Sequence, residues 1–182
     1  MARAFTLNPD GSVSALLEPN ERELLVFLIE DVVELIHETV VESSDSSDAF
    51  EQLAAQFNAR PVAVPTDPAV HRLFPDAFSG DPAAAAEFRR FTEQQLRTQR
   101  AVRSRAVLES LVDAQPEFRL SQDQAHECVQ VLTDLRLVLG TRLGITEDRD
   151  EDETTAAHGV YDWLTWLQEG LVQALFMLPP SK

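Results

Sequence analysis

The stretch from Ser121 to Gly144, SQDQAHECVQVLTDLRLVLGTRLG, constrains the fold more than any other part of the chain. Leucines recur there at three- and four-residue spacing, so they lie on one face of a helix: Leu132, Leu135, Leu139 and Leu143. Val131 and Val138 form a second apolar strip. A helix that is apolar on two sides is usually central, with other elements packed against both. The stretch therefore predicts a mainly α-helical protein, a helical bundle built around this element.

Local signals predict where the helices begin and end. Ser121 with Gln124 is a capping-box pattern, and Gly144 is a natural helix stop. Further helices are expected over residues 19–41, 48–57, 82–114 and 155–178, with one helical turn between Asp67 and Pro75. Prolines interrupt residues 60–82, where Phe74 and Phe78 are expected to anchor the segment to the core.

The N-terminal region has a different pattern from the helices. In residues 3–17 two short apolar runs flank Asn8-Pro9-Asp10-Gly11, a sequence with strong turn chemistry, which predicts a β-hairpin. Residues 43–48 and 146–154 are polar or acidic and are expected to form flexible loops. With 182 residues, the chain 1–182 is predicted to be a single helical domain with this N-terminal hairpin.

Charge and cysteine content narrow the classes of function. The formal net charge is −16, so the chain is repelled by nucleic acid, and no direct nucleic-acid binding is expected. A single cysteine allows no internal disulfide and fits a reducing cytoplasm. No apolar run reaches transmembrane length, so no membrane association is expected. Self-association into a homo-oligomer is compatible with the sequence.

No catalytic, cofactor or metal site is predicted. Glu34 and His37 form one E-x-x-H pair, whereas di-metal bundles use two such pairs. Asp148, Asp150 and Asp152 alternate as in a calcium loop, but the glycine and glutamate that such a loop requires are missing. Cys128 falls on the apolar face of its helix, which favours a small buried hydrophobic residue over a reactive thiol.

Two groups of residues are candidates for a partner interface. The helix that begins at Pro82 concentrates the basic residues of an acidic chain, and its arginines either contact a partner or form ion pairs with the chain's own carboxylates. Both tryptophans lie in the last helix and either pack in the core or anchor a partner. The predicted interface residues are Arg90, Arg97, Arg100, Trp163 and Trp166.

Charged residues also interrupt the central helix. Asp134, Arg136 and Arg142 must each be paired or reach solvent, because an unpaired buried charge is costly. Asp162 and Glu169 of the last helix are the expected partners of the two arginines. The prediction is an ion-pair network of Asp134, Arg136, Arg142 and Asp162 that fixes how the last two helices pack.

Four motifs together resemble an actinobacterial family of domains of unknown function, some of whose members are oxidative-stress transcriptional regulators of the AosR type. The motifs are DPAVHRLFPDAF, DPAAAAEFRRFTEQQLR, TDLRLVLGTRLGI and YDWLTWLQEGLV. The resemblance extends from the N-terminal hairpin to Leu178, and the last two motifs are the specific ones.

The resemblance implies a cytoplasmic regulator without catalytic activity. It implies action through an alternative sigma factor and RNA polymerase, by protein–protein contact, to raise the expression of thiol-protective genes. Sensing by an internal disulfide needs two cysteines, and Cys128 could form only an intermolecular disulfide or be oxidised. The alternative function is a structural or adaptor module that binds other proteins without a role in transcription.

Overall fold

The protein is mainly α-helical, as predicted. The computed structural model describes residues 5–38, 64–78, 80–112, 117–145 and 155–177. The predicted helix over 48–57 and the two predicted loops, 43–48 and 146–154, lie outside these residues. The described helices are α1 (Pro19–Glu38), α3 (Pro68–Leu73), α4 (Pro82–Val112), α5 (Gln122–Arg142) and α6 (Ala156–Phe176). None of them is long and apolar enough to cross a lipid bilayer.

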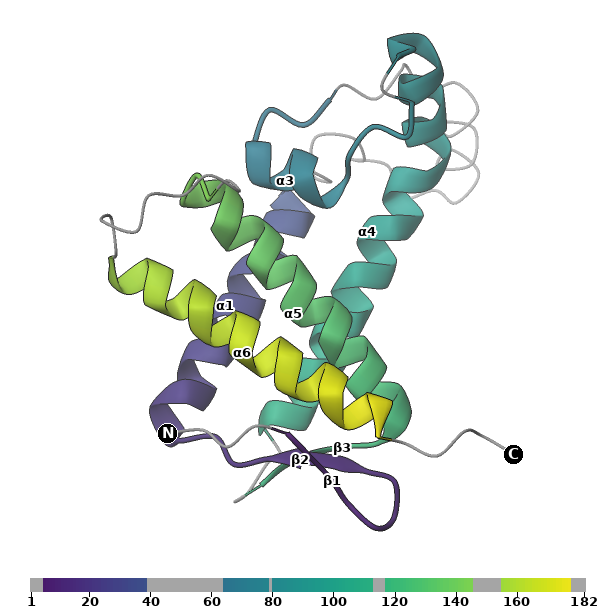
Figure 1. Ribbon diagram of the computed structural model, residues 1–182. Helices are drawn as coiled ribbons and strands as arrows, with labels where there is room; N and C mark the ends of the chain where they lie inside the picture. Colours follow the sequence, from purple (N-terminus) through teal and green to yellow (C-terminus); the bar gives the residue numbers. More distant parts are fainter. Residues whose placement is uncertain (1–4, 39–63, 79, 113–116, 146–154, 178–182) are drawn as a thin grey trace.

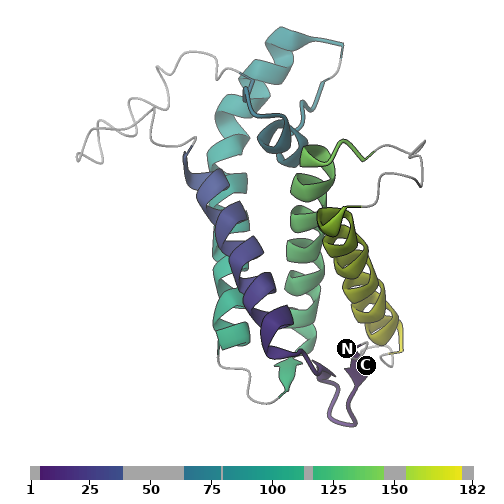
Figure 2. The same cartoon turned by 90° about the vertical axis from the view of Figure 1, so that its left-hand side faces the viewer.

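Helix α5 occupies the centre, where the sequence places it. It contacts α1, α3, α4 and α6, and Figures 1 and 2 show its neighbours on more than one side. Both apolar strips are used, since Leu132 and Leu135 on one and Val131 and Val138 on the other are buried. The burial of two faces is what makes the helix central.

The predicted caps of α5 are present. The Ser121 hydroxyl accepts a hydrogen bond from the Gln124 backbone N–H at 3.3 Å, and the Gln124 side-chain oxygen accepts one from the Ser121 N–H at 2.9 Å. At the other end Gly144 has a φ of 64°, which a residue with a Cβ adopts only at a cost. The Ile145 N–H then bonds the Gly140 carbonyl at 2.9 Å, closing the helix end.

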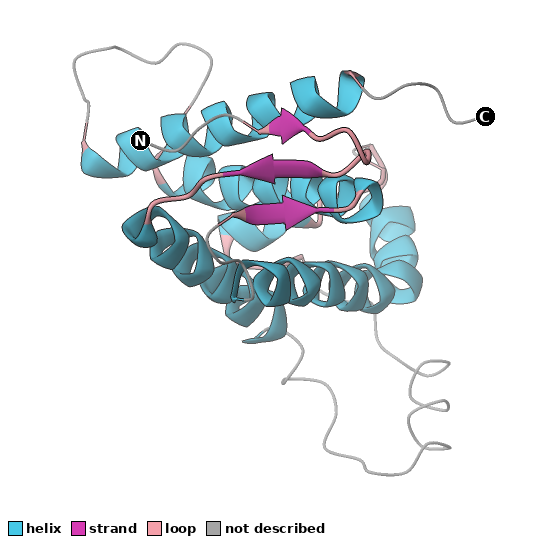
Figure 3. Ribbon diagram, turned by 90° about the horizontal axis from the view of Figure 1, so that it is seen from below, coloured by secondary structure: helices cyan, strands magenta, loops and turns pink. Residues whose placement is uncertain are grey.

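A small sheet covers one end of the helices (Figures 1 and 3). The predicted hairpin consists of β1 (Thr6–Leu7) and β2 (Val13–Ala15), joined by a turn in which Gly11 has a φ of 83°. A third strand, β3 (Phe118–Leu120), pairs antiparallel with β2 and was not predicted. Phe118 and Leu120 are buried, so the sheet is fixed to the helices by apolar contact.

Helix α3 lies at the end of the molecule opposite the sheet (Figure 1). The Asp67 side chain caps it by accepting the Ala69 N–H at 2.7 Å, as the Asp67-Pro68 sequence predicts. Phe74 is buried and anchors this segment, as expected. The same expectation was wrong for Phe78, which is 49% exposed and packs edge-on against the Phe88 ring of α4.

Candidate functional site

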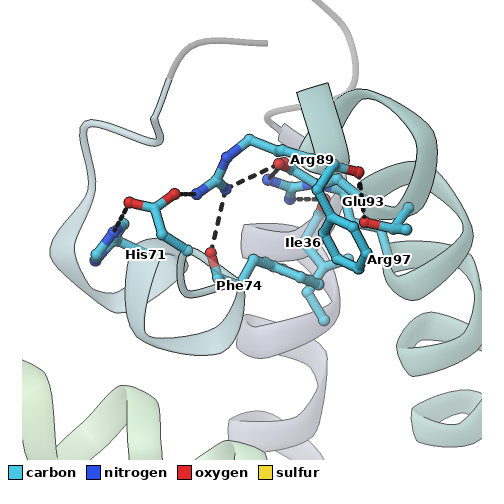
Figure 4. A network of polar contacts seen from close by, with 9 residues as sticks. Ile36, His71, Phe74, Arg89, Glu93 and Arg97 are labelled. Atoms are coloured by element: carbon cyan, nitrogen blue, oxygen red, sulfur yellow. Dashed lines mark hydrogen bonds and ion pairs between the residues drawn. The ribbon is translucent and has the colours of Figure 1, made fainter. Parts of the chain in front are cut away.

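A buried polar network joins α3 to α4 (Figure 4). The Arg89 guanidinium donates to the Phe74 carbonyl at 3.1 Å, to the Glu93 carboxylate at 3.0 Å and to the Asp76 carboxylate at 2.5 Å. The hydrogen bond from Arg89 holds the pKa of the Asp76 carboxyl below its usual value. His71 lies 3.7 Å from the other oxygen of Asp76. Arg89 thus fixes the segment that follows α3 onto α4.

Arg97 extends the network to the end of α1. Its guanidinium donates twice to one Glu93 oxygen, at 2.6 and 2.9 Å, and once to the Ile36 carbonyl at 3.0 Å. The last carbonyls of a helix have no partner within that helix, so this bond satisfies one of them. The guanidinium also lies over the Phe74 ring, 4.5 Å from its centroid. Arg97 therefore ties α1 and the end of α3 to α4.

Arg100 forms the third connection, to α5. It pairs with the buried carboxylate of Asp134 and donates to the Leu73 carbonyl at 3.1 Å. Burial raises the pKa of Asp134 and outweighs the opposite effect of Arg100. The second carboxylate oxygen of Asp134 is buried without a hydrogen-bond partner in the described structure. Asp134 is thus a buried carboxylate whose hydrogen-bond partner is Arg100, with Arg103 also lowering its pKa.

The predicted interface residues of α4 differ in exposure. Arg97 is only 5% exposed and the Arg100 side chain 25%, so little of either is open to a partner, and partner contact by them stays a prediction. The other interpretation, ion pairs with the chain's own carboxylates, describes them. Arg90 is half-buried and lies over the Phe91 ring, 4.3 Å from its centroid. The sequence contains a signal for the network: Arg89, Glu93 and Arg97 follow one another at four-residue spacing and so share a helix face.

The charged residues of α5 have partners on three different helices. Asp134 pairs with Arg100 of α4, and Arg142 pairs with Asp31 of α1 at 2.7 Å. Arg136 donates to the Gln168 side-chain oxygen of α6 at 2.6 Å and lies over the Tyr161 ring. Asp134 and Arg142 thus pair with helices other than α6, and Arg136 reaches α6 through a neutral acceptor. The part predicted for Asp162 in this network stays a prediction.

The two tryptophans differ in their surroundings. Trp163 is half-buried against the core, and its indole N–H is buried without a hydrogen-bond partner in the described structure. Trp166 is 39% exposed, on the outward face of α6 between Asp162 and Glu169. Trp163 thus fits the core-packing interpretation, whereas partner binding by Trp166 stays a prediction.

A surface pocket of about 220 Å³ lies beside the polar network. Leu73, Phe74, Pro75 and Asp76 form one side, and α4 residues from Ala85 to Arg100 form the other. Its polar groups already bind one another, because Asp76 and Glu93 are both held by Arg89. The pocket walls are thus mainly apolar, with the charged network as part of their base.

The residues considered as a reactive thiol or as metal ligands do not form one site in the described structure. Cys128 is buried, and desolvation raises the pKa of its thiol to about 12, so it stays protonated and unreactive at neutral pH. His37 is exposed and contacts Arg105 at 2.9 Å between the two nitrogens. Within the described ranges, no three His, Cys, Asp or Glu residues are grouped so that they could hold a metal ion. Asp148, Asp150 and Asp152 are outside those ranges.

The fold and its polar network define a helical protein with a three-stranded sheet at one end and an Arg–Glu–Arg cluster inside. A family model, "Domain of unknown function (DUF2017)", matches residues 2–175. The chain therefore belongs to this family, as the sequence motifs predict. No solved structure matches it.

Mycobacterial proteins are similar to the chain over most of its length. The proteins named "Oxidative stress regulator AosR" from Mycobacterium tuberculosis and Mycobacterium bovis are each 30% identical over 177 residues, covering 87% of this chain and 80% of their own. A Mycobacterium leprae relative is 30% identical over 180 residues, covering 88% of this chain and 81% of its own. These relatives bear names of regulators, which supports a regulatory role for the family.

Proposed function

We propose that the protein is a non-enzymatic regulator of the oxidative-stress response that acts by contact with an alternative sigma factor or RNA polymerase. The observation that carries this proposal is the similarity, over 87% of the chain, to proteins named as oxidative stress regulators. Such a protein changes transcription by binding to the transcription machinery, and it needs no catalytic centre to do so.

The distribution of its charges supports protein contact over DNA contact. A DNA-binding protein uses exposed Lys and Arg side chains to neutralise phosphates. Here Arg89, Arg97 and Arg100 of the arginine-rich helix α4 are bound to the chain's own Asp76, Glu93 and Asp134. The net charge of −16 repels phosphate at longer range.

The properties of the single cysteine, Cys128, argue against direct sensing of an oxidant by this protein. Cys128 is buried with a raised pKa, and no second cysteine exists to form an internal disulfide. We therefore propose that this protein responds to oxidative stress through its partner or its own abundance, and that its own thiol is not the sensor.

A deletion strain of the native host tests the function. Transcripts of thiol-protective genes are measured before and after diamide, in the wild type, in the deletion strain, and in deletion strains complemented with the intact gene or with Cys128→Ala. Both complemented strains are expected to restore an induction that the deletion strain lacks. Equal induction in the wild type and the deletion strain would refute a regulatory role.

Binding of the purified protein distinguishes the proposed mode of action from the adaptor alternative. The protein is mixed with RNA polymerase core, with each purified alternative sigma factor of the host, and with promoter DNA alone. Binding to polymerase or to one sigma factor, without a gel shift of DNA alone, is the expected result. Binding to neither of them, with normal transcript induction in the deletion strain, would favour an adaptor module outside transcription.

A further inference from the structure

The outward face of α1 combines one large apolar side chain with acidic residues. Glu23, Phe27, Glu30 and Glu34 follow one another at spacings of four, three and four residues, so they lie on one side of the helix. All four are exposed, and Phe27 has 63% of its surface open to solvent. A single exposed apolar side chain is ordinary, but Phe27 lines one pocket together with the exposed Val112, so the two form an apolar patch.

A groove runs between this face and the end of α4. Its volume is about 240 Å³, and its base is Leu111, which is fully buried. Phe27 and Val112 form its apolar rim, and Val112 is 68% exposed. The Arg22 side chain, which is half-buried, lines one side of the groove. The groove can thus receive an apolar side chain and enclose it between two helices.

The carboxylates around the groove are unpaired. Glu23 and Glu30 line it, Glu34 lies one turn beyond Glu30, and Glu109 lies one turn before Val112 on α4. In the part of the chain that the structure describes, none of these four carboxylates has a hydrogen bond or an ion pair, and all four are exposed. By contrast, Asp76, Glu93 and Asp134 are bound by arginines of α4.

We propose that this groove is a docking site for a partner helix that presents a large apolar side chain flanked by Lys or Arg. The apolar side chain fills the groove between Phe27 and Val112, and the basic side chains meet the carboxylates of α1 and α4. Charge complementarity selects this occupant, because a second copy of the chain, with net charge −16, would bring like charges together. The proposal stands on this surface alone and holds whether or not the partner belongs to transcription.

Two synthetic helical peptides serve as probes. Both carry leucine along one face, and the other face carries arginine in one peptide and glutamate in the other. The arginine peptide is expected to bind the intact protein, with binding that weakens as salt is added, and the glutamate peptide is not. Backbone amide shifts measured by NMR are expected to change most at residues 22–30 and 109–112.

Matched variants separate the groove from general attraction to an acidic protein. Phe27→Ala should weaken binding by about tenfold or more, because a central aromatic residue carries much of an interface's affinity. The control Phe91→Ala removes an aromatic residue that is 60% exposed elsewhere on α4, and it should leave binding unchanged. The double change Glu23→Gln with Glu30→Gln should weaken binding by about threefold to tenfold.

The charge control lies on α6. Asp162→Asn with Glu169→Gln removes the same two charges from the exposed face that carries Trp166, and it should leave binding unchanged. Equal losses from the α1 and α6 double variants would overturn the proposal, since they would indicate attraction to net charge alone. Unchanged binding by Phe27→Ala, or loss on Trp166→Ala with amide shifts confined to α6, would overturn it as well.

Discussion

Replacement of Arg97 by methionine tests whether the interior network stabilises the fold. Arg97 donates two hydrogen bonds to Glu93 and one to the Ile36 carbonyl, and each hydrogen bond to a charged group contributes about 1.5–3 kcal/mol net. Methionine retains the apolar stem, so packing is largely kept. Glu93 still pairs with Arg89 in the variant. This places the loss near the lower end of the range for a broken buried pair, about 3 kcal/mol.

Arg142→Met is the matched control. Arg142 also joins two helices through one ion pair, with Asp31 at 2.7 Å, but the two side chains are 46% and 39% exposed. Exposed pairs contribute about 0–1 kcal/mol because water and salt screen them. Replacement by methionine should therefore lower the free energy of unfolding little at Arg142 and strongly at Arg97. The difference between the two losses measures the effect of burying the ion pair.

Urea denaturation, followed by circular dichroism and tryptophan fluorescence, gives the free energy of unfolding of both variants. A loss of about 3 kcal/mol corresponds to a fall in melting temperature of about 9 °C for a chain of this size. If Arg97→Met lies within about 1 kcal/mol of Arg142→Met, then the desolvation of the network cancels its attraction, and the reasoning above is wrong.

Three further predictions follow from single residues. The pKa of Asp134 is raised in the native state, so the native state binds this proton more tightly than the unfolded chain, in which the pKa is near 3.8. The free energy of unfolding should therefore fall as the pH rises above 3.8 through the raised pKa. Urea titrations of Asp134→Asn should lack this dependence. Gly144→Ala should cost about 1–2 kcal/mol in thermal melts, because φ is 64° there, and an unchanged melting temperature would contradict it. Cys128 should react with a thiol reagent only in denaturant, and rapid reaction of the native protein would refute its burial.

The elements that the sequence predicts correctly carry their signals locally. The Ser121–Gln124 capping box, Gly144 and the two apolar strips of α5 lie within one helix, and the Asn8–Gly11 turn lies within one hairpin. Each signal depends on a few neighbouring residues, so it survives without knowledge of the tertiary structure. Strand β3 has only Phe118 and Leu120 facing the core, which is too short a pattern to recognise before its partner β2 is known.

The partners of the charged residues could not be predicted in the same way. The sequence indicates that Asp134, Arg136 and Arg142 need partners, but the orientation of α4 and α1 around α5 decides which groups come within reach. The sequence leaves open whether Arg97 contacts a partner or pairs with the chain's own carboxylates. The position of Arg97 four residues after Glu93 indicates an ion pair on one face of the helix. Small buried residues on the same face, Ala85 and Ala101, allow neighbouring helices to approach this pair.

The location of the paired and unpaired charges suggests how a protein of this family would select its partner. Three arginines of α4, Arg89, Arg97 and Arg100, neutralise Asp76, Glu93 and Asp134 within the molecule, so these three add little positive field outside it. The unpaired carboxylates lie on exposed helix faces, including Glu23 and Glu30 of α1. An acidic surface of this kind speeds the approach of basic proteins and slows that of phosphates. In the proposed docking, selection by charge precedes apolar contact, and the groove beside the same carboxylates then determines which basic protein stays bound.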